Sequence, residues 1–172
     1  METIEKETCP ICKEKTLTMT EDEKDIPFFG QVYLFSMTCS NCKFHKADVE
    51  AVEMKDPIKI TFITEDEEDM NVRVVKSSQA TVKIPTLKMS VESSPNSNGY
   101  VTNIEGLINR FEKIVHEQKD TTDDETIKKT AKNLLKKIWK VKLGEIPIKI
   151  IIEDLTGNSA IISDKAIVEK LK

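Results

Sequence analysis

The stretch "CPIC", from Cys9 to Cys12, and a second stretch "CSNC", from Cys39 to Cys42, contain all 4 cysteines of the 172-residue chain. A two-residue spacing turns the backbone so that both sulfurs of a pair face one point, and two such turns supply four ligands to a tetrahedral zinc ion. Disulfides are the first alternative, but they are rare in a reducing cytosol. A redox centre is the second, but its CxxC pair begins a helix in a βαβ unit, a context that neither pair has. We therefore predict one structural zinc ion bound by Cys9, Cys12, Cys39 and Cys42.

The other candidates for site chemistry are weaker. His45 lies close to Cys42, but four thiolates already complete the tetrahedron, so we expect a surface or neighbouring histidine, and His116 is expected on the polar face of a helix. A closed four-thiolate site leaves no position for a catalytic water. The chain also lacks a phosphate-binding glycine loop and a recognisable set of nucleophile, base and orienting residue. The sequence predicts that the protein is not an enzyme.

Composition indicates a globular protein with a strongly charged surface. Charged residues make up 33% of the chain and hydrophobic residues 38%, and the formal net charge is −4. An acidic balance argues against general nucleic-acid binding, which usually requires an excess of Lys and Arg. The N-terminus "METIEKETCP" has no apolar targeting region, and the apolar run "IPIKIII" at 146–152 is as long as a strand rather than a membrane span. We therefore expect a cytoplasmic protein without a membrane segment.

Alternating apolar and polar residues predict β-structure on both sides of a helical region. The first 55 residues contain three strand-like stretches, and the pattern stays β from Ile58 to Ser94. The acidic run Glu65–Asp69 is expected to be a solvated loop, because it lacks the spacing of a calcium-binding loop. The segment 94–99 has the residues of a turn. The three early stretches are 16–20, 31–39 and 47–54.

Residues from about 102 to 143 predict two helices joined by a polar loop. Thr102 with Glu105 and Thr122 with Glu125 have the spacing of capping boxes, and Gly144 is placed to end the second helix. Apolar residues recur with the helical period on one face of each helix. The first stripe is Ile104, Leu107, Ile108, Phe111, Ile114 and Val115, and the second is Ile127, Ala131, Leu134, Leu135 and Ile138.

These elements predict an α+β fold that is mainly β. Residues 1–55 form a zinc ribbon, and residues 56–172 form a β-barrel that carries the helical hairpin as an insertion. Since the helices interrupt the β-region, strands before Ser94 must pair with strands after Glu145. The barrel is therefore expected to close through contacts between distant parts of the chain.

Four stretches in this order resemble the ZPR-type zinc-finger family in its short, single-module, archaeal form. They are the region "IPFFGQVYLFSMTCSNC" with both cysteine pairs, "RVVKSSQATVKIPTLKMSVE" at 73–92, "GYVTNIEGLI" at 99–108 and "IIIEDLTGNSAI" at 150–161. The resemblance implies a zinc ribbon beside a barrel of the double-stranded β-helix type with a helical-hairpin insertion. One departure is that Lys13 and Lys43 stand where the family usually has glycine after the second cysteine of each pair. A left-handed lysine there costs about 1 kcal/mol, which is small against roughly 10–16 kcal/mol for structural zinc, so zinc binding should survive.

The resemblance also implies a function in protein interaction. Larger members carry the module twice, bind translation elongation factor 1-alpha and assist its folding, and they are also reported to bind receptor tyrosine kinases. For this chain we expect binding of elongation factor 1-alpha through the ribbon loop at Phe28, Phe29 and Gly30 and the barrel turn at Gly157, Asn158 and Ser159. An aromatic pair beside polar turn groups has the composition of an interface anchor with a polar rim. The alternatives are that the phenylalanines belong to a core and that the turn only closes a tight hairpin.

The second functional hypothesis is nucleic-acid binding by the ribbon protein. Lysines recur at helical spacing along the second predicted helix, although the chain has few aromatic residues on which bases could stack. A lysine stripe opposite an apolar stripe is also the ordinary solvated face of an amphipathic helix. The stripe consists of Lys129, Lys132, Lys136 and Lys140.

Overall fold

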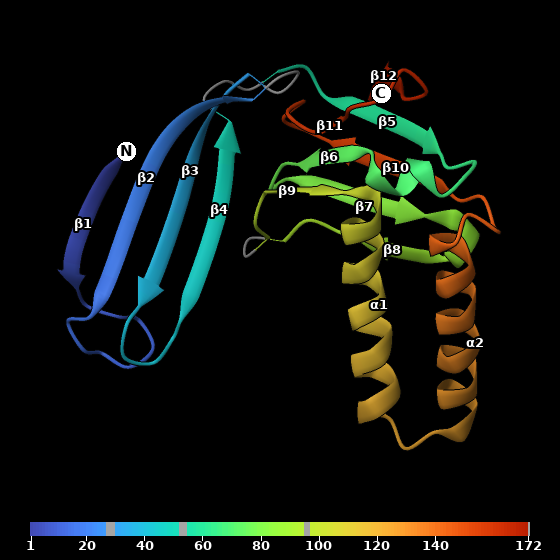
Figure 1. The fold of residues 1–172 in the computed structure, drawn as a ribbon, viewed down its shortest axis with the longest axis horizontal. Coiled ribbons are helices and arrows are strands. Elements are labelled where there is room, and N and C mark those ends of the chain that lie inside the picture. Colours follow the sequence, from blue (N-terminus) through green and yellow to red (C-terminus); the bar gives the residue numbers. More distant parts are fainter. Residues whose placement is uncertain (27–29, 52–54, 95–96, 172) are drawn as a thin grey trace.

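The computed structural model describes residues 1–26, 30–51, 55–94 and 97–171, which form an N-terminal sheet, a sandwich of two further sheets and two helices (Figure 1). The helices run side by side and project from the sandwich. The chain is thus mainly β with an inserted helical pair, and the predicted α+β class is confirmed.

The N-terminal sheet contains four antiparallel strands among the described residues, in the order β1-β2-β3-β4. Prediction gave three strands and missed β1, whose residues are all exposed and therefore carry no apolar alternation. The loops β1–β2 and β3–β4 hold the two cysteine pairs at one end of the sheet. The strands are β1 (Glu2–Glu7), β2 (Leu17–Ile26), β3 (Gly30–Cys39) and β4 (His45–Ala51).

The sandwich closes through pairing between distant parts of the chain, as predicted. Strand β10 (Lys149–Asp154) lies between β5 (Ile58–Ile63) and β7 (Ala80–Ile84), and β11 (Ala160–Ile161) pairs with β6 (Arg73–Lys76). Within the described ranges the sheet orders are β12-β5-β10-β7-β8 and β11-β6-β9. The prediction missed two strands, β9 (Tyr100–Asn103) and β12 (Ile167–Lys170), and β8 spans Met89–Val91.

The helices α1 (Ile104–Thr121) and α2 (Glu125–Lys142) occupy the predicted region, but both predicted capping boxes are wrong. Asn103 caps α1 by accepting a hydrogen bond from the Gly106 amide at 2.8 Å, because strand β9 continues to Asn103 and leaves Thr102 in the strand. Asp124 caps α2 through the Thr126 amide at 2.7 Å, whereas Thr122 ends α1. Gly144 follows α2 with a φ of 72°, as its role in ending the helix requires.

The main apolar core lies between the two sheets and under the helices. It includes Phe62 of β5, Phe111 of α1 and Ile138 of α2, each at most 2% exposed. Ile114 and Ile127 were predicted to be buried with the apolar stripes, but their side chains are 45% and 39% exposed. Both lie in the half of the hairpin that points away from the sheets, where no strand covers them (Figure 1). The lysine stripe of α2 is exposed throughout, as predicted for a solvated face.

The acidic run at 65–69 is only partly the solvated loop that we predicted. Asp69 is 5% exposed and sits in a short 3-10 helix, Glu68–Asn71. Its carboxylate accepts hydrogen bonds from the Glu65 amide at 2.8 Å and from Lys165 Nζ at 3.2 Å. The run therefore ends on a buried carboxylate that ties the loop to the chain before β12.

A small second core joins the N-terminal sheet to the sandwich. Val32 of β3 and Val75 of β6 are both completely buried there. Asp48 of β4 accepts a hydrogen bond from the Gly99 amide at 2.7 Å. A side chain on Gly99 would meet the Val49 carbonyl oxygen at 2.3 Å, so only glycine allows this close approach. The junction lies at the end of the sheet opposite the cysteine loops (Figure 1).

Candidate metal centre and partner surface

The four cysteine sulfurs meet in the arrangement that a tetrahedral metal requires. Their Sγ atoms all lie within 4.8 Å of one another. Cys9 Sγ is 3.6 Å from Cys42 Sγ, and Cys12 Sγ is 3.7 Å from Cys39 Sγ. Four sulfurs about 2.3 Å from a central zinc ion would be separated by about 3.8 Å, so these distances fit a single ion. Within the described part of the chain this is the one group of His, Cys, Asp and Glu side chains placed to hold a metal ion.

Each cysteine pair is held by the same backbone turn. The Cys9 amide donates to the Glu14 carbonyl oxygen at 2.9 Å, and the Cys39 amide donates to the Phe44 carbonyl oxygen at 2.8 Å. Lys13 and Lys43 adopt the left-handed conformation, with φ of 64° and 61°. Both lysines therefore have the left-handed conformation that was expected at these positions. Each lysine Nζ also donates to the carbonyl oxygen three residues earlier, at 2.9 Å in both turns.

The surroundings of the site shift the pKa values of two of its thiols in opposite directions. A hydrogen bond with Thr16 lowers the pKa of the Cys39 thiol to about 6, which favours the thiolate that binds a metal. The pKa of Cys42 is raised to about 11: a backbone hydrogen bond involving Phe44 acts to lower it, but desolvation and the neighbouring thiols outweigh that effect. Four thiolates in one small volume repel one another, and a divalent cation at their centre offsets this repulsion. The donor set, the distances and the closed coordination fit structural Zn²⁺, one per chain.

The histidines lie outside the site. His45 is exposed, and its Nδ1 lies 3.1 Å from the Thr38 hydroxyl on the neighbouring strand. His116 is exposed on α1, with its Nδ1 3.5 Å from Lys119 Nζ. The predictions of a surface His45 and a polar-face His116 are confirmed.

The predicted partner turn at Gly157, Asn158 and Ser159 is buried and organised around a carboxylate that the prediction missed. Asp154, which is fully buried, accepts hydrogen bonds from the Ser159 amide and hydroxyl, both at 2.7 Å, and from the Asn158 amide at 3.0 Å. The Ser159 hydroxyl also accepts from the Ser77 amide at 3.0 Å. The prediction treated the polar groups of this turn as available to a partner. That reasoning is wrong for Ser159, whose hydroxyl is used inside the protein.

A sequence signal for Asp154 exists in "DLTGNS". An Asp that ends a buried strand and is followed by Thr, Gly, Asn and Ser is typical of a turn in which one carboxylate accepts several following amides. Gly157 has a φ of 66°, and a side chain there would meet the Asp56 carbonyl oxygen at 2.2 Å. Glycine is therefore required at this position for two separate reasons.

Lys55 lies close to one glycine of each predicted partner segment, Gly30 and Gly157. Gly30 has a φ of 90°, and a side chain there would lie 3.8 Å from Lys55 Nζ, while one on Gly157 would lie 2.8 Å from Lys55 Cβ. The Lys55 amide donates to the Thr156 carbonyl oxygen at 2.8 Å. Lys55 thus links Gly30 to the barrel turn. Phe28 and Phe29 lie outside the described residues, so their part of the surface stays a prediction.

Comparisons with known proteins match both parts of the chain to one family. The ZPR1 zinc-finger domain matches residues 2–55, and the ZPR1 jelly-roll domain matches residues 68–171. The chain belongs to the ZPR1 family. The jelly roll is the double-stranded β-helix that the sequence resemblance implied, and the four-cysteine centre is the zinc site of the ZPR1 zinc finger.

The chain is similar to archaeal and eukaryotic ZPR1 proteins. It is 37% identical over 165 residues to a ZPR1-like protein of Methanocaldococcus jannaschii, covering 95% of this chain and 83% of the relative. A ZPR1-like protein of Pyrococcus horikoshii is 34% identical over 167 residues, covering 95% of this chain and 75% of the relative. The zinc finger chaperone zpr1 of Schizosaccharomyces pombe is 36% identical over 144 residues, which cover 78% of this chain but 29% of that protein. The chain thus spans most of the length of the two archaeal relatives and about a third of the yeast protein. No helix within the described residues has the length and apolarity needed to cross a membrane.

Proposed function

We propose that this ZPR1 protein binds translation elongation factor 1-alpha in the cytoplasm and assists its folding. The observation that carries the proposal is the 36% identity with a relative named as a chaperone, extending over 144 residues. The complete four-thiolate centre supports a structural rather than a catalytic role for the metal. Binding of elongation factor 1-alpha is what the family resemblance implies for this chain.

The proposed contact surface joins the ribbon loop to the barrel turn. Gly30 and Gly157 both lie against Lys55, so a partner resting on this end touches the ribbon and the jelly roll together. Phe28 and Phe29 supply the apolar anchor in this proposal, because aromatic side chains dominate interface energies. Ser159 holds the turn in shape through Asp154 instead of offering its hydroxyl to the partner.

Calorimetric titration of elongation factor 1-alpha from the same organism tests the proposal. Binding by the wild type and loss of at least about tenfold in affinity for Phe29→Ala are expected, as for a hot-spot aromatic. Ile11→Ala is the matched control, because Ile11 is 64% exposed and lies in the first cysteine loop, at the other end of the sheet. Both variants must keep their zinc. Absence of binding by the zinc-loaded wild type would remove elongation factor 1-alpha as the partner.

Nucleic-acid binding is the second candidate, and α2 supplies the observation that favours it. Lys129, Lys132 and Lys136 are exposed, and the single tryptophan of the chain, Trp139, is 59% exposed on the same helix. Lysines and an exposed aromatic ring are the groups that bind single-stranded nucleic acid. Titration of a single-stranded RNA followed by tryptophan fluorescence tests this idea, since the signal comes from Trp139 alone. Binding that weakens steeply with salt would support it, as would loss of binding by Trp139→Ala when binding is followed by the fluorescence anisotropy of a dye-labelled RNA.

A further inference from the structure

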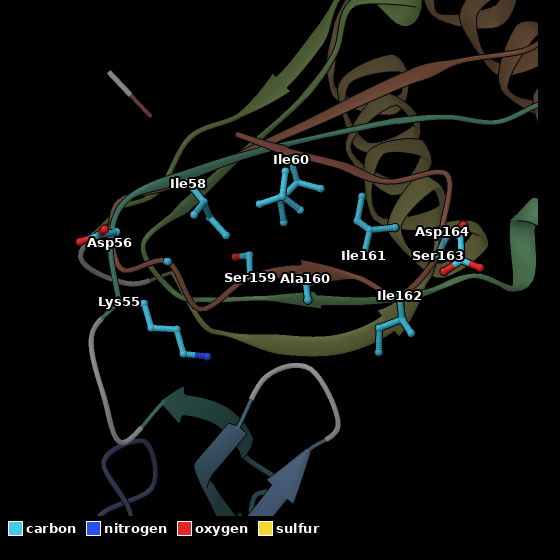
Figure 2. Close-up of a pocket in the computed structure, with 12 residues that line it drawn as sticks. Lys55, Asp56, Ile58, Ile60, Ser159, Ala160, Ile161, Ile162, Ser163 and Asp164 are labelled. Atoms are coloured by element: carbon cyan, nitrogen blue, oxygen red, sulfur yellow. The ribbon is translucent and has the colours of Figure 1, made fainter. Parts of the chain in front are cut away.

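A groove of about 630 Å³ is lined by β5 and by Val168 of β12 on one side and by β11 on the other. Its volume lies in the range of ligand-binding pockets, about 300–1,000 Å³. Figure 2 shows Ile58 and Ile60 of β5 across from Ile161 of β11. Ile60 and Ile161 belong to the main core, so the floor of the groove is the core itself. The other apolar lining residues are Ala160, Ile162 and Val168.

The five-stranded sheet extends beyond the sheet that should cover it. Val168 of β12 lies opposite Ile60 of β5, so both side chains point to the same, inner face of the sheet. Ile60 is 1% exposed, but Val168 is 61% exposed. In a sandwich, inward-facing residues of one sheet are covered by the facing sheet. Among the described residues, the three-stranded sheet ends at β11, and Val168 on the inner face of β12 stays exposed.

β11 is the edge strand of its sheet within residues 1–26, 30–51, 55–94 and 97–171, and it lines the same groove as Val168. Ala160 and Ile161 lie opposite Val75 and Val74 of β6, and the Ile162 amide donates to the Arg73 carbonyl oxygen at 2.9 Å. Hydrogen-bonded and non-hydrogen-bonded pairs alternate along an antiparallel ladder. The Ile161 amide therefore points away from β6, toward the side on which a further strand would pair. The Ile161 carbonyl oxygen points the same way but already accepts a hydrogen bond from the Ser163 amide at 3.1 Å, so the amide is the group that this edge offers to such a strand.

We infer that this groove binds one extended segment of a client protein, which pairs beside β11 as a fourth strand and covers Val168. A strand satisfies both features at once, because one of its carbonyl oxygens accepts from the Ile161 amide at the β11 edge while alternate side chains fill the apolar floor. The inference rests on the proposed function, since a protein that assists folding meets clients whose strands are not yet paired.

The residues at the two ends of the groove indicate which side chains the client segment should carry. One end is closed by the Gly157 turn, which packs against Asp56. Asp164, which is exposed, lines the other end, where Figure 2 shows it beside Ser163. The expected segment has apolar residues at alternate positions and a Lys or Arg that meets Asp164.

Val168 and Ile167 provide a matched pair of variants for the test. They are neighbours on β12, 61% and 60% exposed, but adjacent strand residues face opposite sides and only Val168 lines the groove. Val168→Lys places a charge in the groove, and Ile167→Lys places the same charge on the outer face. Both positions are already exposed, so both variants should keep their zinc and melting temperature.

The probe is an array of overlapping peptides of about twelve residues, long enough for one strand, that covers the sequence of elongation factor 1-alpha from the same organism. The full zinc-loaded chain is expected to bind peptides with alternating apolar residues. Val168→Lys should weaken this binding at least about tenfold, whereas Ile167→Lys should change it less than about twofold. Amide exchange at Ile161 should slow when such a peptide is bound.

The outcomes separate this inference from the function on which it rests. Binding of full-length elongation factor 1-alpha without binding of any peptide would overturn the groove inference and leave the proposed function intact. Equal peptide affinity of Val168→Lys and Ile167→Lys would likewise overturn the groove inference and leave the proposed function intact. If neither the full-length protein nor any peptide binds the wild type, both proposals fail.

Discussion

The zinc ribbon and the jelly roll differ in what holds their strands together. Around the cysteines, the buried residues of the ribbon are Cys9, Leu17 and Cys39, and most residues of the outer strands are exposed. The jelly roll buries a continuous core that reaches from β5 through β10 to both helices. A sheet with so little buried apolar surface needs a further link, which four metal-thiolate bonds supply. The comparison indicates that metal determines the stability of one region and apolar burial that of the other.

Replacing a zinc ligand should have the largest effect. Cys39→Ser removes a fully buried thiolate, and the loss of zinc forfeits much of the roughly 10–16 kcal/mol that structural zinc supplies. Elemental analysis is expected to give about one zinc per wild-type chain and markedly less for the variant. Lys13→Gly serves as the control, because it changes a cysteine loop without removing a thiol. A wild type purified without chelator and containing almost no zinc would contradict the assignment.

Truncating a buried side chain of the helical hairpin should have the second largest effect on stability. Ile138 of α2 is fully buried, so Ile138→Ala should lower the free energy of unfolding by about 2–5 kcal/mol. Leu134, on the same predicted stripe, is half-buried, and Leu134→Ala should cost less. Lys136→Ala, on the exposed face, should change stability by less than about 0.5 kcal/mol. Urea denaturation of the three variants measures the series, and equal effects would mean that the buried face of α2 is misassigned.

The buried carboxylate of Asp154 should make the jelly roll sensitive to acid. Burial acts to raise its pKa, but hydrogen bonds from Ser159 and Thr156 outweigh burial and hold the pKa below the ordinary value. Asp154→Asn should cost about 2–3 kcal/mol at neutral pH, because hydrogen bonds to a charged acceptor are weakened or lost.

The pH dependence follows from the direction of this shift. A lowered pKa in the folded state means that the ionised carboxylate stabilises the fold above about pH 4 and that this contribution is lost as the pH falls through the lowered pKa. The stability difference between wild type and Asp154→Asn should therefore shrink in acid. Unfolding curves between neutral and acidic pH check this, and a difference that grows in acid would be inconsistent with a lowered pKa.

Relieving the strain in a cysteine loop should have the smallest effect. Lys13 has a φ of 64°, which glycine adopts more readily, so Lys13→Gly should leave zinc binding unchanged and raise stability by at most about 1 kcal/mol. Lys15→Gly is the matched control, because Lys15 is also exposed in this loop but has no positive φ. Thermal unfolding of the zinc-loaded proteins compares the two.

Sequence patterns predicted those features in which the spacing of one residue type determines the local geometry. Two CxxC pairs predicted the metal centre, and the helical period of α1 and α2 predicted both helices and the pairing of strands across them. The patterns failed for β1 and β12, whose residues are exposed and show no apolar alternation. They also missed Asp154, because its burial depends on the distant residue Ser77 meeting the Ser159 turn. The cap of α1 was misplaced because the end of β9, a tertiary feature, sets the start of α1, and the cap of α2 because α1 extends to Thr121.

Amide exchange before and after chelation of zinc tests most directly whether the two regions are stabilised differently. Amides beside the cysteines, in residues 9–17 and 39–44, are expected to lose their protection, while those in β5, β10 and α1 keep it. Val32 and Val75 at the junction mark where the effect should end. Equal loss of protection across residues 146–162 would show that zinc and the apolar core stabilise one cooperative unit, and would contradict the account.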